Sequence, residues 1–126
     1  MINQTKTIWQ LPSKSQEFLD GPQVLMTRSS VTIKYDYETS TGEYQWASMV
    51  FRGVFGFAFT TPRTCSVEQI RSYDTLVELE SSDWVKELLS RWPDVLERPV
   101  VHHYRIYFDD IGCYEIAATH FEPSSP

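Results

Sequence analysis

The stretch VVHHYRIYFDDIGCYEIAATH, residues 100–120, decides the fold class, because two alternating strand patterns flank a turn. Residues 109–112 form that turn, and a type I turn followed by a left-handed glycine predicts a three-residue hairpin loop. In this register Asp109 faces Cys113. A loop of two or four residues would instead move Glu115 onto the apolar face, where an unpaired carboxylate is costly. The sequence therefore predicts an antiparallel hairpin.

The two faces of this hairpin differ in polarity. The polar face of the hairpin carries the candidate catalytic residues His103, Arg105, Tyr107 and Glu115. In the predicted register Tyr107 faces Glu115, and Arg105 is the diagonal neighbour of Glu115. A histidine beside a carboxylate can perform general acid–base catalysis, and an arginine can hold an anionic substrate. The alternative, which is usual in antiparallel sheets, is a solvated strand face with a cross-strand ion pair. The opposite face is apolar and gathers Tyr104, Ile106, Phe108, Tyr114, Ile116 and Ala118.

The clearest helix is predicted over residues 83–92, upstream of the hairpin. Ser81 or Ser82 supplies its N-cap, and Pro93 ends it. The helix carries an apolar stripe, which must lie against an apolar surface, and the sheet is the only candidate large enough. That stripe consists of Trp84, Leu88 and Trp92. Residues 66–70 show the capping-box pattern of a second, shorter helix.

Alternating patterns predict further strands before the helix. Residues 23–38 alternate from Ser30 onward, with Asp36 on the solvated side. Residues 43–60 follow a turn and contain a glycine that marks a bulge or bend. Residues 73–80 give one more strand.

We therefore expect an α+β domain. A curved, mostly antiparallel sheet of about five or six strands would carry one main amphipathic helix packed on one face. Residues 1–22 are predicted to form an N-terminal arm, which could dock on the domain through Trp9 and Leu11. Residues 23–122 would form the single domain, and residues 123–126 a short tail.

Three phenylalanines in the strand of residues 43–60 offer a weak ligand site. Phe55, Phe57 and Phe59 share one face, and the small residues Gly56 and Ala58 share the other. The small face would let a helix or strand approach closely. Core packing explains the phenylalanines most simply, and a hydrophobic ligand pocket is the alternative.

Composition excludes several partners. The 126 residues carry a net charge of −6, which disfavours nucleic acid and anionic membranes. No apolar stretch approaches the roughly 20 residues of a membrane span, and no signal peptide precedes the fold. Cys65 and Cys113 lie far apart and outside any CxxC pattern, so reduced thiols in a cytoplasmic protein are expected.

No metal or cofactor is predicted. His102 and His103 are adjacent and point to opposite strand faces, and His120 pairs with His102 in the predicted register without a third ligand. The Asp109–Asp110 turn lacks the oxygen spacing of a calcium loop. No nucleotide-binding or hydrolase motif occurs.

Three segments resemble an uncharacterised group of small bacterial stand-alone domains. They are HHYRIYFDDIGCYEIAATHFE, FRGVFGFAFT and YDTLVELESSDWVKEL. The resemblance covers roughly the C-terminal two-thirds of the chain. It implies a bacterial cytoplasmic domain and assigns no functional residue.

Three functions follow from the sequence, and whether the chain is an enzyme stays open. The first is a non-catalytic binding or protein-interaction domain, for example a homodimer formed through a sheet edge or the Trp9 arm. The second is a binder of an unidentified hydrophobic small molecule in a pocket between sheet and helix. The third is a small enzyme that uses the His/Arg/Tyr/Glu strand face.

Overall fold

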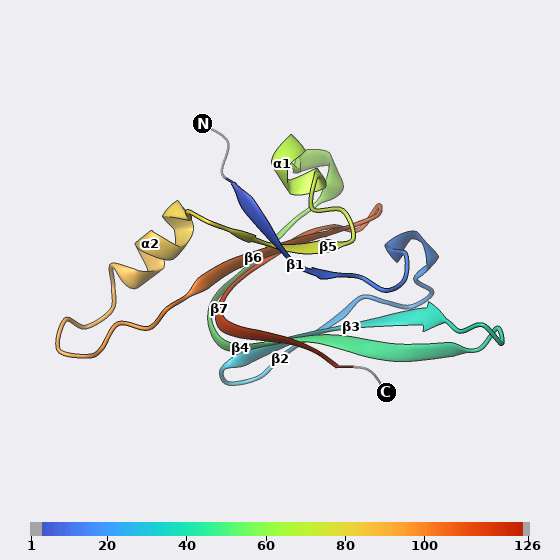
Figure 1. The fold of residues 1–126 in the computed structure, drawn as a ribbon, viewed down its shortest axis with the longest axis horizontal. Coiled ribbons are helices and arrows are strands. Elements are labelled where there is room, and N and C mark those ends of the chain that lie inside the picture. The colour runs from blue at the N-terminus through green and yellow to red at the C-terminus, as the bar shows by residue number, and fades with distance from the viewer. Residues whose placement is uncertain (1–3, 125–126) are drawn as a thin grey trace.

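The computed structural model describes residues 4–124, which form one antiparallel sheet with two short helices (Figure 1). The strands follow the spatial order β1-β5-β6-β7-β4-β3-β2. Their bounds are β1 Thr5–Gln10, β2 Gln23–Met26, β3 Ser30–Glu38, β4 Tyr44–Thr60, β5 Thr75–Leu79, β6 His102–Phe108 and β7 Gly112–Ser124. The helices are α1 Val67–Ile70 and α2 Asp83–Leu89, and 3-10 turns span Ser15–Glu17 and Pro62–Thr64.

The sheet has seven strands, so the expectation of five or six is wrong. Residues 5–10 of the N-terminal segment pair with β5 as an edge strand, β1. Residues 23–38 split into β2 and β3, because a turn closes where Thr27 N donates to Ser30 O. The predicted main helix is also shorter than expected, since α2 ends at Leu89.

The two longest strands bend, and the bend folds the sheet into two layers that enclose the core. Figure 1 shows β4 and β7 curving from an upper layer with β1, β5 and β6 into a lower layer with β2 and β3. The predicted irregularity in β4 is confirmed, because Gly53 has a φ of +62° and the β4–β7 register shifts between Val54 and Gly56. A β-bulge increases local bending in this way.

The core lies between the two layers. Phe51 of β4 packs against Tyr104 of β6 with ring centroids 5.5 Å apart, so the layers meet through aromatic side chains. Residues from the N-terminal segment join this core, because Leu11 is buried and Trp9 lies against Tyr35 and Phe121. The predicted apolar face of the hairpin is part of the same cluster.

The hairpin register differs from the predicted one. Phe108 pairs with Gly112, and Arg105 pairs directly with Glu115. The loop still has three residues, but Asp110 takes the left-handed conformation with a φ of +55°. The shift is an even number of positions, so both predicted faces of the hairpin survive it.

The helix α2 lies on the outer face of the sheet, as its apolar stripe predicts. The small face of β4 receives it. A Cβ atom built on Gly56 would lie 2.8 Å from Cζ2 of Trp84 and 3.0 Å from Cδ1 of Leu88. Glycine at this position therefore allows the backbone of β4 and the side chains of α2 to meet.

One predicted solvated residue is instead buried. The carboxylate of Asp36 on β3 accepts hydrogen bonds from the backbone amides of Leu19, Asp20 and Gly21. Three such donors satisfy a buried carboxylate, which explains why a charged residue is tolerated there. Among residues 4–124, no helix is long and apolar enough to cross a membrane.

Candidate functional site

A largely buried carboxylate, that of Glu115, organises the outer face of the sheet. Glu115 Oε1 accepts hydrogen bonds from His103 Nε2 at 2.8 Å and from Arg105 Nε at 3.0 Å. Glu115 Oε2 accepts one from Gln69 Nε2 at 3.0 Å. On its other side, the ring of His103 meets Ser82 Oγ at 2.7 Å through Nδ1. We call these five residues the carboxylate network.

Strand pairing and two helix caps bring the network together. Arg105 and Glu115 are direct cross-strand partners, and His103 is the diagonal neighbour of Glu115. Gln69 completes the capping box of α1, and its side chain also reaches across to Glu115. Ser82 is the N-cap of α2, where its hydroxyl oxygen accepts from Val85 N. Both helices are thereby tied to the same carboxylate.

The network keeps Glu115 ionised. Burial alone would raise the pKa of Glu115, but the hydrogen bond from His103 and the charge of Arg105 outweigh burial and lower that pKa to about 2. Only 13% of the Glu115 side chain and 7% of the His103 side chain are exposed. The charged partner of Glu115 is Arg105, of whose side chain 12% is exposed, so this ion pair is largely desolvated and each partner depends on the other.

The ionised state of Glu115 sets the direction of its hydrogen bond with His103. An ionised carboxylate only accepts, so His103 Nε2 donates to Glu115. In the neutral ring Nδ1 then accepts from the hydroxyl of Ser82, whose oxygen accepts the amide proton of Val85. This order of hydroxyl, imidazole and carboxylate is also that of a Ser–His–carboxylate triad, in which the carboxylate orients the imidazole.

The packing around these side chains favours a structural role. The ring of Trp84 stands edge-on to His103 with centroids 5.0 Å apart, and both ring nitrogens of His103 are already bonded. Both carboxylate oxygens of Glu115 are bonded as well. In such a triad the serine hydroxyl must be free to attack a substrate, whereas Ser82 Oγ accepts the Val85 amide as the N-cap of α2. The network is therefore better suited to holding α1 and α2 on the sheet than to catalysis.

Three of the four predicted strand-face residues meet, and the fourth does not. Tyr107 pairs with Cys113 and lies against the ring of Tyr73, 6.1 Å away, so it does not face Glu115 as predicted. Ser82 and Gln69 complete the network without having been predicted as site residues. Their capping patterns are visible in the sequence, but their contacts with β6 and β7 are not.

The histidines that were considered as metal ligands do not come together. His102 pairs with Ala118, not His120, and its Nδ1 lies 2.6 Å from Glu78 Oε2. His120 instead pairs with Arg52 on β4. Within residues 4–124, no group of three or more histidine, cysteine or acidic side chains could hold a metal ion.

Phe55 and Phe57 line one open groove together, and Phe59 is not among the residues that line it. Phe55 packs against Trp92 with centroids 5.5 Å apart, whereas Phe57 and Phe59 pack against Tyr114. This open groove of about 220 Å³ lies between the β2–β3 turn and β4. Ligand pockets for drug-sized molecules usually enclose about 300–1,000 Å³, so this groove is small.

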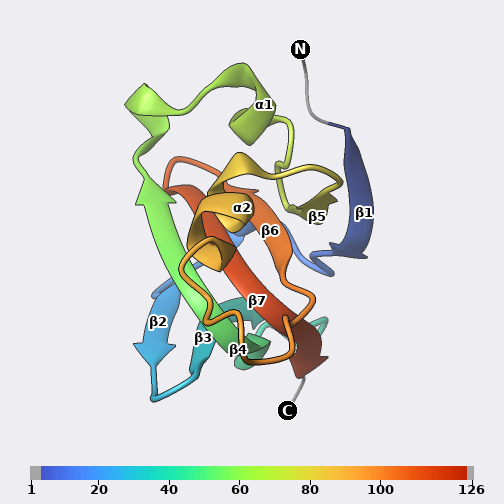
Figure 2. The same cartoon turned by 90° about the vertical axis from the view of Figure 1, so that its left-hand side faces the viewer.

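Large apolar side chains are exposed at this same end of the molecule. The edge strand β2 exposes 57% of Leu25 and 59% of Met26, and the segment after α2 exposes 91% of Val95. The contact of Phe55 with Trp92 connects the two areas. Figure 2 shows β2 and the segment after α2 on one side of the molecule, with β4 between them. We call this surface the apolar end; it comprises Val24, Leu25, Met26, Phe55, Trp92, Val95, Leu96 and Val100.

Comparison of the chain with protein-family models, with curated proteins and with solved structures finds no match. The functional argument therefore rests on the carboxylate network and the apolar end.

Proposed function

We propose that this chain is a non-catalytic protein-interaction domain that binds its partner through the apolar end. The observation that carries the proposal is the exposure of consecutive apolar side chains on the edge strand β2, together with Val95 and Leu96 beyond α2. Along β2, Val24 and Met26 face one side of the strand and Leu25 faces the other, and large exposed apolar side chains gathered on an edge strand favour a protein partner. An unpaired edge strand also offers backbone groups to an added strand.

The competing functions have less support. The carboxylate network commits Ser82 Oγ to capping α2 and both ring nitrogens of His103 to hydrogen bonds inside the protein, which favours a structural role over catalysis. The groove beside Phe55 and Phe57 is open and small, which disfavours a hydrophobic ligand. A reducing, cytoplasmic compartment fits the proposal, because Cys65 and Cys113 are both free thiols.

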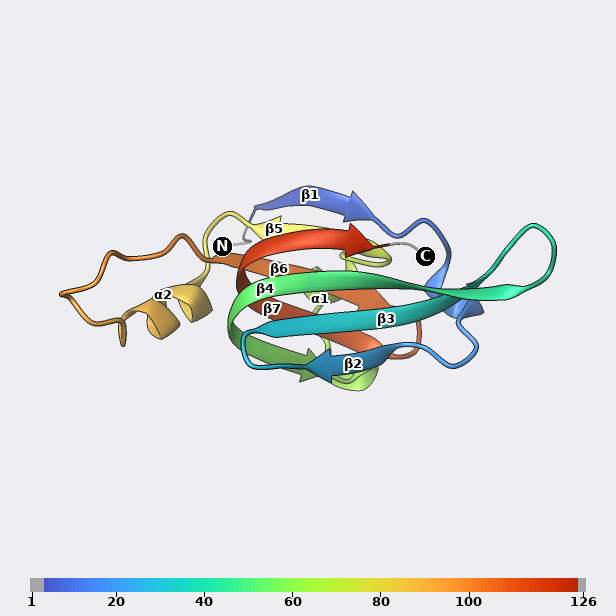
Figure 3. The same cartoon turned by 90° about the horizontal axis from the view of Figure 1, so that it is seen from below.

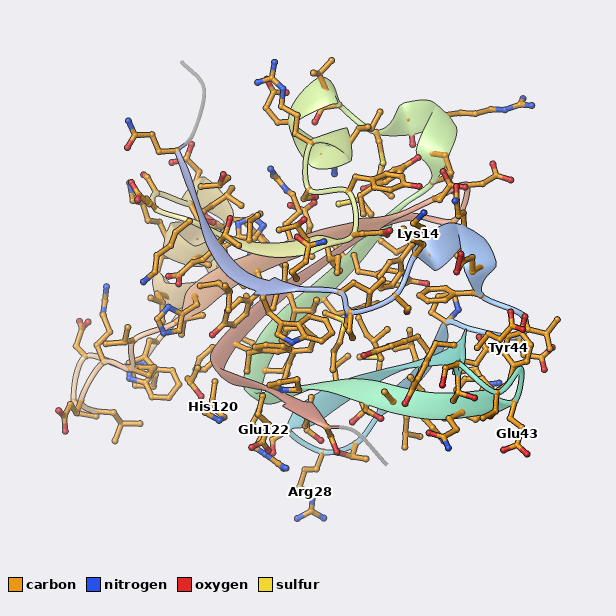
Figure 4. All side chains as sticks on the ribbon, turned by 45° about the vertical axis from the view of Figure 1, so that its right-hand side comes forward. Lys14, Arg28, Glu43, Tyr44, His120 and Glu122 are labelled. Atoms are coloured by element: carbon orange, nitrogen blue, oxygen red, sulfur yellow. The ribbon has the colours of Figure 1, made fainter. Side chains whose placement is uncertain are left out.

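Site-specific photo-crosslinking tests the proposal. A photoreactive phenylalanine analogue replaces Leu25 on β2 in one variant and Lys14 in a control variant, both at exposed positions. Figure 4 shows Lys14 on a different part of the surface from Arg28, which follows β2. In cells that express the protein, discrete adducts should form from position 25 and not from position 14. The absence of any adduct from position 25 would refute the proposal.

A further inference from the structure

The two cysteines of the chain, far apart in the sequence, meet at the outer face of the sheet. Cys65 follows the 3-10 turn of residues 62–64, and Cys113 lies on β7. Thr60, at the end of β4, is the cross-strand partner of Cys113, and its carbonyl oxygen accepts a hydrogen bond from Cys65 Sγ at 3.5 Å. The backbone amide of Cys113 donates a second hydrogen bond to the Cys65 sulfur. Strand pairing thus brings the sulfur of Cys65 to the backbone of Cys113.

Cys113 lies beneath the segment that leads from Cys65 through α1 to β5. Its side chain is fully buried, and the buried hydroxyl of Ser72, just after α1, lies within hydrogen-bonding reach of its thiol. On β7 the side chain of Cys113 shares a face with Glu115, which Gln69 of α1 also reaches. Figures 1 and 3 show α1 on the side of the sheet away from β2 and β3. Both thiols therefore lie in the contact between the α1 segment and β7.

The two thiols differ in their access to solvent. Cys65 is partly exposed, whereas Cys113 is fully buried. Burial raises the pKa of the Cys65 thiol, and the hydrogen bond from the Cys113 amide opposes that rise. Burial raises the pKa of the Cys113 thiol as well, and the negative charge of Glu115 raises it further. Because oxidation follows access and thiolate character, Cys65 is the thiol that an oxidant reaches first.

We propose that Cys65 and Cys113 form a reversible disulfide under hydrogen peroxide, and that this bond ties the α1 segment to β7. The Cys65 sulfur attacks one oxygen of the peroxide, so that an S–O bond forms, the O–O bond breaks and the second oxygen leaves as water with the thiol proton. The Cys113 sulfur then attacks the sulfenic acid of Cys65. The S–S bond forms, the S–O bond breaks, and hydroxide leaves as water with the Cys113 proton. The two thiols lose two electrons in total, and the peroxide is reduced to two waters.

The bond should stabilise the fold. It closes a loop of roughly 50 residues, which lowers the conformational entropy of the unfolded chain. We expect the melting temperature of the oxidised protein to exceed that of the reduced protein by at least about 5 °C. A melting temperature that falls on oxidation would show that the bond forms only by distorting the fold, and would overturn the inference. The inference does not depend on the proposed interaction at the apolar end.

Peroxide treatment of the purified, folded protein tests the inference. An excess of hydrogen peroxide should remove both titratable thiols and the mass of two hydrogen atoms from the wild-type chain, and dithiothreitol should restore them. Peptide mapping should find Cys65 linked to Cys113 within one chain. Thiols that stay reduced, or a chain that gains oxygen without a crosslink, would overturn the inference.

Single alanine variants separate the roles of the two thiols. In Cys113→Ala the sulfenic acid of Cys65 has no thiol to resolve it, so dimedone, which captures sulfenic acids, should label this variant more than the wild type. In Cys65→Ala the buried Cys113 should lose its thiol at least about tenfold more slowly than the wild type does. Circular dichroism checks that both variants fold. Loss of the Cys113 thiol at the wild-type rate in Cys65→Ala would show that Cys113 reacts without Cys65, which contradicts the proposed sequence of steps.

Discussion

Arg105 and Glu115 face each other directly across β6 and β7, and Arg105 Nε donates to Glu115 Oε1 at 3.0 Å. Replacing Glu115 with alanine leaves a desolvated guanidinium without its counter-charge and removes the acceptor of His103 as well. We expect the free energy of unfolding to fall by about 3–5 kcal/mol. Equilibrium urea denaturation measures this loss.

The exposed pair of Arg52 and Glu122 supplies the control. These side chains are also cross-strand neighbours with a 2.7 Å contact, but 58% and 44% of their surface is exposed. Figure 4 shows Glu122 near the molecular surface. Glu122→Ala should cost less than about 1 kcal/mol. If Glu115→Ala and Glu122→Ala lower the free energy of unfolding by the same amount, the carboxylate network does not stabilise the fold in the way we infer.

Acid should weaken the fold through Glu115. The pKa of Glu115 is lowered from 4.5 to about 2 in the folded protein, so the unfolded chain takes up a proton at higher pH than the folded one. The stabilisation is therefore complete above about pH 4.5 and is lost as pH falls toward 2, with an upper limit of about 3 kcal/mol. Urea denaturation at pH 6, 4 and 3 should show the gap between wild type and Glu115→Gln narrowing. A gap that is constant over this range would contradict the assignment.

Ser82 caps α2 and also contacts His103 on β6, so removing its hydroxyl should cost both interactions. Ser82→Ala removes the acceptor of Val85 N and the partner of His103 Nδ1. We expect a loss of about 1–2 kcal/mol in the free energy of unfolding. Ser81→Ala, at the exposed neighbouring position, should change it by less than about 0.5 kcal/mol. If both variants lose the same free energy, Ser82 is not the residue that caps α2.

Much of this fold follows from local pattern. The faces of β6 and β7, the amphipathic helix and the capping box at Ser66 all follow from spacing, because alternation and helical periodicity are local properties. Two features do not. The strand β1 is stabilised by its pairing with β5, some 70 residues away in the chain, and TKTIWQ has no strong alternation of its own. The other is the hairpin register, in which Phe108 pairs with Gly112 and Asp110 adopts the left-handed conformation that Gly112 was expected to take.

The candidate site likewise has contacts that the sequence pattern predicts and contacts that it does not. Proximity of His103, Arg105 and Glu115 follows from strand alternation, which survives an even shift of register. The contacts of Gln69 and Ser82 depend on where α1 and α2 settle on the sheet, and that placement is tertiary. Exposure of β2 follows from its place at the edge of the sheet, which only the complete strand order reveals.

Gly56 sets the distance between β4 and α2, so a single methyl group should disturb it. In Gly56→Ala the new Cβ would lie 2.8 Å from Trp84 and 3.0 Å from Leu88. Overpacking of this kind costs about 1–3 kcal/mol, which urea denaturation would record. Leu88→Ala removes one of the two contacts and lets the helix settle, so Gly56→Ala should cost at least about 0.5 kcal/mol less in that background. Strictly additive losses would show that α2 does not rest on Gly56 in solution.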